Sequence, residues 1–153
     1  MRGRSVVLIL LGALSLASAS LAARAALTPA RYRAEASAIC VRMHGDMAGL
    51  ASYRSVDTRP SMIRYLTAAV PTERSYVAAL RSLRPPAQLR SMHDGLVADG
   101  VAQLALTTRF LATLKVTTDR GFRAAVELWG AEAATTSSDE KALLVGLRLP
   151  KCI

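Results

Sequence analysis

The sequence is poor in the residues and short motifs that mark common active sites. Two cysteines, one tryptophan, two phenylalanines and four tyrosines occur in 153 residues. There is no Gly-x-Ser-x-Gly nucleophile motif, no glycine-rich phosphate loop and no calcium loop. A Cys-x-x-Cys redox pair and the Cys-x-x-Cys-His sequence that attaches haem covalently are also absent. The sequence therefore predicts no catalytic residue and a protein that is not an enzyme, with a small hydrolase as a further alternative.

Histidine is scarce too, and its surroundings exclude a di-iron carboxylate site. Such sites in helical bundles need Glu-x-x-His pairs on facing helices. The residues three positions before His44 and His93 are Val41 and Arg90. Neither histidine can therefore complete such a pair.

Alternating strand patterns, low-complexity linkers and repeats of solenoid length are absent as well. From residue 28 onward, apolar residues instead recur every three or four positions, which is the period of an amphipathic helix. Thr28-Pro29 is expected to open a first helix that fades near Tyr53. Pro60 is expected to open a second helix with a kink or short break at Pro71, and a third is expected from about Pro86.

The fourth helix has weaker boundary signals. Thr117-Thr118-Asp119 is expected to cap its start, and Gly146 is expected to stop it, with Pro150 beyond. Residues 135–140 resemble a loop in composition, but the helical phase is kept across them, so we expect a continuous helix. Four amphipathic helices with short connections predict an all-α, antiparallel (up-down) four-helix bundle.

The first 25 residues have the layout of a secretory signal peptide. Arg2 and Arg4 precede an apolar run over residues 6–16, and small residues at Ala23 and Ala25 form a signal-peptidase site. We therefore predict a signal peptide over 1–25, a single helical-bundle domain over 26–153 and a secreted, extracytoplasmic protein. The alternative is an uncleaved membrane anchor, because residues 5–23 carry no charge.

The mature chain is basic. Loss of the three arginines of the signal segment leaves seventeen basic residues and eleven acidic ones, a net charge of +6. This charge favours an anionic envelope polymer or membrane surface as partner. The arginines are scattered and aromatic residues are few, whereas a nucleic-acid surface needs a basic stripe with stacking aromatics, so we predict no nucleic-acid partner.

The two cysteines are expected to form one disulfide, because an exported chain meets an oxidising environment. Cys40 lies on the apolar stripe of the first helix, and Cys152 follows the end of the fourth. If helices one and four are neighbours in the bundle, the tail needs only to fold back over helix one. The alternative is two free thiols.

Three motifs give the chain a family resemblance. These are A-x-A-I-C at residues 36–40, L-R-x-L-x-P-P at residues 80–86 followed by His93, and G-L-x-x-P-x-C at residues 146–152. Together with the signal peptide, they resemble small secreted or lipid-anchored helical proteins of high-GC Gram-positive bacteria. The resemblance implies a helical fold and a disulfide bridge but no activity. The chain departs from the lipid-anchored members because it has no lipid-modified cysteine.

Methionine and histidine supply the one cofactor alternative. Thioether and imidazole groups suit copper, and a non-covalent haem is the other option, although methionine on an apolar stripe ordinarily fills gaps in a core. Otherwise we predict no cofactor-binding residue, and Trp129 is interpreted as core, with a ligand pocket between helices as the alternative. The candidate ligands are Met43, His44, Met47, Met92 and His93.

Cleavage of the signal peptide can be tested by mass. We expect the exported protein to begin at Ala26, because small residues occupy positions 23 and 25. Intact-mass spectrometry of the protein recovered outside the cytoplasm measures this directly. A mass that retains residues 5–23 would establish the membrane-anchor alternative instead.

Overall fold

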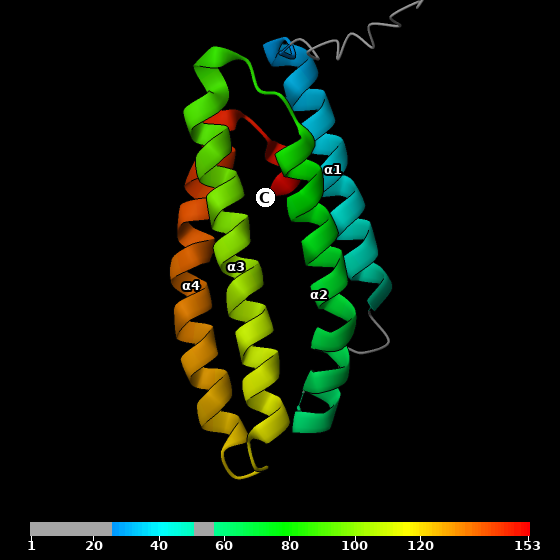
Figure 1. The fold of residues 1–153 in the computed structure, drawn as a ribbon, viewed down its shortest axis with the longest axis vertical. Coiled ribbons are helices and arrows are strands. Elements are labelled where there is room, and N and C mark those ends of the chain that lie inside the picture. Colours follow the sequence, from blue (N-terminus) through cyan, green and yellow to red (C-terminus); the bar gives the residue numbers. More distant parts are fainter. Residues whose placement is uncertain (1–25, 51–56) are drawn as a thin grey trace, which may run out of the picture.

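The computed structural model describes residues 26–50 and 57–153, apart from the side chains of residues 136–138. The described part is all-helical, with four long helices and no strand. The helices run along the long axis of the molecule (Figure 1). The bounds are α1 Pro29–Gly49, α2 Arg59–Ser82, α3 Arg90–Val116 and α4 Phe122–Leu147, with short 3-10 turns η2 Ala87–Leu89 and η3 Pro150–Cys152. The predicted all-α fold is confirmed, while the predicted signal segment and Tyr53 lie outside the described residues.

Threonine side chains start the first two helices, as the sequence predicts. The Thr28 hydroxyl accepts a hydrogen bond from the backbone N–H of Arg31 at 3.3 Å. Thr58 and Ser61 form a reciprocal capping box, in which each side-chain oxygen accepts from the other residue's backbone N–H. Each start also places a proline in the first turn, where its missing N–H removes no helical hydrogen bond.

The break expected at Pro71 does not occur, because α2 is continuous from Arg59 to Ser82. Pro71 and Thr67, whose carbonyl loses its helical donor, are both on the exposed side of the helix. Water can therefore hydrate that carbonyl. On the other side of the helix, Val70 is buried in the lower part of the interior and Val77 in the upper part.

Both predicted ends of the fourth helix need correction. The N-cap of α4 is Gly121 and not the Thr117-Thr118-Asp119 segment, although the Thr118 hydroxyl accepts from Gly121 N–H in the preceding turn. The helix passes Gly146 and ends at Leu147, where Arg148 takes the left-handed conformation with φ 58°. Gly146 instead lies where α4 meets α3, because a Cβ there would be 2.9 Å from Met92 Sδ. The predicted continuity of the helix through residues 135–140 is confirmed.

Consecutive helices lie against one another, and the interface between α3 and α4 is the most extensive (Figure 1). The first helix contacts α2 and the C-terminal turn η3. It has 21 residues, while the other three have 24 to 27. In Figure 1, α1 therefore stops before it reaches the lower ends of α2, α3 and α4.

The interior consists of two apolar clusters. The upper core surrounds the disulfide, and the lower core lies toward the connection between α3 and α4. Members of the upper core are Tyr32, Ala36, Cys40, Tyr76, Val77, Leu80, Leu89, Leu96, Leu144, Leu147, Leu149 and Cys152. Members of the lower core are Met62, Leu66, Val70, Phe110, Leu111 and Leu114.

A disulfide joins Cys40 of α1 to Cys152 of η3, as the sequence predicts, and it closes a loop with a sequence separation of 112. Both cysteines are buried in the upper core. Near the same end, Arg33 Nε donates a hydrogen bond to the Leu147 carbonyl at 3.0 Å, which satisfies one of the free carbonyls at the end of α4. The bridge and this hydrogen bond hold α1 to the end of α4.

Replacing both cysteines with alanine is expected to lower the free energy of unfolding by up to about 4–5 kcal/mol. The reason is that the cross-link restricts the unfolded chain, and the restriction grows with the length of the closed loop. Urea unfolding with and without a reducing agent measures the effect. The double variant is its own control, because reductant should no longer change its midpoint; equal stability of the two proteins would contradict the prediction.

Candidate functional site

The structure separates the two histidines named by the sequence. His93 is buried, and its Nδ1 lies 3.1 Å from the Tyr32 hydroxyl, with the two rings packed edge to face. Burial lowers the pKa of His93, with only partial compensation from Asp94. His44 is exposed on α1, twelve residues beyond Tyr32, which corresponds to about 18 Å along a helix. The two imidazoles therefore cannot share one metal ion.

The methionines are separated in the same way. Met43 and Met92 pack against the upper core, and Met92 fills the space beside Gly146. Met47, in contrast, lines a cavity together with His44. Of the five candidate ligands, only this pair comes together on a cavity wall.

This cavity, called here the His44 cavity, lies between α1, α2 and α4 and has a volume of about 530 Å³. It lies beside the C-terminal end of α1, and α1 stops before the lower ends of α2 and α4 (Figure 1). Its walls combine thioether, aromatic and imidazole groups. The lining residues are His44, Met47, Ala48, Leu50, Met62, Tyr65 and Trp129.

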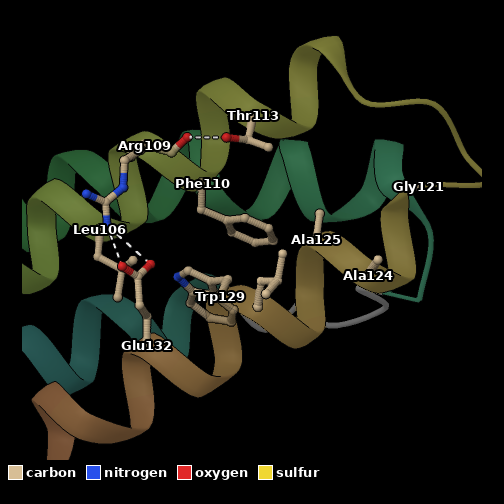
Figure 2. A pocket seen from close by; sticks show the side chains of 10 residues that line it. Leu106, Arg109, Phe110, Thr113, Gly121, Ala124, Ala125, Trp129 and Glu132 are labelled. Atoms are coloured by element: carbon tan, nitrogen blue, oxygen red, sulfur yellow. Dashed lines mark hydrogen bonds and ion pairs between the residues drawn. The ribbon is translucent and has the colours of Figure 1, made fainter.

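A second depression, the α3–α4 groove, has a volume of about 400 Å³ (Figure 2). Its floor is the ring of Phe110 stacked on the indole of Trp129, with centroids 4.8 Å apart and planes 8° from parallel. At its edge, Arg109 Nη2 pairs with the Glu132 carboxylate at 3.0 and 3.2 Å. Leu128 also lines it and is 74% exposed.

Trp129 is common to both depressions. Its indole lines the His44 cavity as well as the α3–α4 groove, so one ring forms part of the wall of each. Its Nε1 is buried and has no hydrogen-bond partner among the described residues. Trp129 therefore packs at the edge of the lower core and also forms part of the walls of both depressions.

Three carboxyls occupy positions that lie, along the sequence of each helix, between residues of the upper core and residues packed in or against the lower core. These carboxyls belong to Glu73 of α2, Asp99 of α3 and Glu140 of α4, and all three are partly buried. Burial raises the pKa of each one. Repulsion from Asp139 adds to the shift at Asp99, and repulsion from Asp99 adds to the shift at Glu140, where a hydrogen bond from Tyr76 acts in the opposite direction.

Among the described residues, no ion pair includes these carboxyls, although attraction from His44 lowers the pKa of Glu140 and so opposes the effect of burial. The ion pairs that the structure shows are Arg31–Glu35, Arg59–Asp119 and Arg109–Glu132, and none of these includes Glu73, Asp99 or Glu140. One oxygen of Glu73 and one of Asp99 are buried without a hydrogen-bond partner. In the part of the chain that the structure describes, no group of three or more His, Cys, Asp or Glu side chains is arranged to hold a metal ion.

Comparison with known proteins leaves the chain without a match among family models, curated proteins or solved structures. The candidate sites therefore rest on their own geometry. None of the helices within residues 26–50 and 57–153 is both long enough and apolar enough to cross a membrane.

Sequence reasoning missed two contributors to these sites. Met62 has the spacing of a core residue on α2, and only the fold brings it to the cavity that His44 and Met47 line. Glu73, Asp99 and Glu140 lie on three different helices and form no local motif. The sequence does place each of these acids close to the apolar stripe of its helix. The stripe alone does not indicate which acids of different helices lie near one another.

We expect the three carboxyls to make the fold less stable as the pH rises. Folding raises their pKa values, so the folded state keeps protons that the unfolded state releases. Their stabilising contribution is complete below about pH 4 and is lost as the pH passes through the raised values. The lowered pKa of His93 acts in the opposite direction and is common to all proteins compared.

The test is the variant Glu73→Gln, Asp99→Asn, Glu140→Gln, with urea unfolding measured between pH 4.5 and 8. The free energy of unfolding of the variant should rise relative to the unmodified protein as the pH increases. Glu127→Gln, which changes an exposed carboxyl of α4, is the matched control and should show no such trend. A difference that stays constant over this range would contradict the assignment.

Proposed function

We propose that this protein is a secreted binding protein that acts at the cell envelope without catalysis. In this proposal, residues 1–25 are a signal peptide that is removed, and the helices form an up-down four-helix bundle closed by the disulfide. The partner is an anionic envelope polymer or membrane surface whose phosphate groups meet a basic protein surface, and nucleic acid is not a partner. The Cys40–Cys152 bridge supports the extracytoplasmic location, because disulfides persist in oxidising compartments.

The observation that carries the proposal is the unequal placement of charge. No arginine or lysine of the described residues is buried; Arg33 and Arg59 are half-buried, and the others are exposed. Three of the eleven acidic side chains are also half-buried, and burial raises their pKa values. Most exposed charged residues of the described chain are therefore arginine or lysine, and such a surface attracts anionic groups.

A second candidate function is a copper or non-covalent haem carrier. It is supported by one observation, the convergence of His44 and Met47 on a cavity that also has aromatic walls. The hydrolase alternative receives no such support. Among the described residues, no serine or cysteine lines either depression at Trp129, and His93 is engaged with Tyr32.

Binding to anionic surfaces is expected to depend on salt. Sedimentation with vesicles of phosphatidylglycerol and phosphatidylcholine should retain the protein at about 0.01 M salt and release it near 1 M, where the Debye length falls from about 30 to 3 Å. Vesicles of phosphatidylcholine alone are the control. Purified teichoic acid in place of the vesicles distinguishes a polymer from a lipid surface. Absence of salt-sensitive retention on both materials would refute the envelope role.

A further inference from the structure

The fold divides the soft metal ligands of the domain into two sets. Residues 26–153 contain four methionines and two histidines. Met43, Met92 and His93 are committed to packing and to the hydrogen bond with Tyr32. The remaining three residues, His44, Met47 and Met62, all line the His44 cavity.

We propose that the His44 cavity binds a monovalent soft metal ion, the cuprous ion, through His44, Met47 and Met62. This inference rests on the second function proposed above, the carrier role of the cavity, and it names the ion. Thioether sulfur is a soft ligand that selects Cu(I), and imidazole suits copper as well. The sequence suggested five candidate ligands but did not indicate which of them share a site, and it did not include Met62. The fold brings His44, Met47 and Met62 to one cavity.

The placement of the three residues allows them to act together. His44 and Met47 are three positions apart on α1, so their side chains project from neighbouring positions of one helix face. Met62 approaches from α2 and is 6% exposed, at the boundary between the lower core and the cavity. Unbranched methionine side chains can adjust to an ion at little energetic expense, because three rotatable bonds separate the sulfur from the backbone.

The rest of the cavity wall favours a soft cation over other ligands. Among the described residues, no carboxylate and no thiolate lines the cavity, so this wall does not supply the carboxylate oxygens typical of Mg²⁺ and Ca²⁺ sites or the usual ligand set of Zn²⁺. The aromatic rings of Tyr65 and Trp129 form the remaining large surfaces. An aromatic face attracts a cation and keeps water away from it.

Trp129 also provides the measurement, because it is the single tryptophan of the chain and lines the proposed site. The exported protein is titrated with Ag⁺, a soft monovalent ion that is stable in air, while Trp129 fluorescence is recorded. Cu⁺ is then titrated without oxygen in competition with a chromophoric chelator. We expect a change in fluorescence that saturates at one ion per protein, and no response to Zn²⁺ or Mg²⁺.

The methionines provide a matched control. Met47→Leu, Met62→Leu and His44→Gln should each weaken binding of Ag⁺ and Cu⁺ at least about tenfold. Mutation of a residue that only hydrogen-bonds to a metal ligand already weakens metal affinity by about this factor. The double variant Met43→Leu, Met92→Leu removes as many thioethers from the upper core and should bind as the unmodified protein does. Methionine and leucine have similar volumes, so these changes preserve packing. Circular dichroism checks that each variant is folded; if Met62→Leu is not, His44→Gln and Met47→Leu decide the question.

Three results would overturn the inference. The first is that the folded, unmodified protein binds neither Ag⁺ nor Cu⁺. The second is that the Met43/Met92 variant loses as much affinity as the Met47 and Met62 variants. The third is that His44→Gln and Met47→Leu both retain full affinity. A haemin titration separates this failure from that of the carrier role. If haemin binds with an absorption band that His44→Gln changes while Ag⁺ does not bind, the carrier role stands and the cuprous site is refuted. If neither ligand binds, both are refuted.

Discussion

The position of α1 is the constraint on which the rest of the structure depends. This helix packs on α2 and is tied to the end of α4 by the Cys40–Cys152 bridge and by the hydrogen bond from Arg33 to the Leu147 carbonyl. All of these attachments except the α2 interface lie toward the upper core. α1 is also the shortest of the four helices, and the His44 cavity lies beside its C-terminal end, next to Met62 of the lower core.

The division of the interior into two cores also affects where carboxyl groups lie. Carboxyls on α2, α3 and α4 interrupt the apolar stripes between the two cores, and burial raises their pKa values. The shift has this direction because burial disfavours the ionised form, which loses its hydration. Because these three carboxyls are half-buried while nearly all arginines and lysines are exposed, basic residues outnumber acidic ones among the exposed charged residues described. The interior and the surface electrostatics are thus two results of one arrangement.

Local signals predicted the elements well where chemistry within a few residues decides them. Thr28 and Thr58 cap α1 and α2 because a hydroxyl next to a free N–H needs no tertiary partner. Pro71 does not break α2, and its exposed side of the helix leaves the freed carbonyl open to water. Gly146 was misleading as a helix stop, because it lies where α4 packs closely against Met92 of α3. Helix propensity is a weak preference that such contacts override.

The sequence by itself determined the helical class, the number of long helices and the pairing of its two cysteines, because periodicity, caps and a single pair of thiols admit few alternatives. Only the tertiary structure decided which methionines and which histidine share a cavity, and which carboxyls face the interior. These choices depend on the length of α1 and on the rotation of each helix against its neighbours. A stripe of apolar residues defines a face of one helix, but it does not define which part of the opposite helix that face meets.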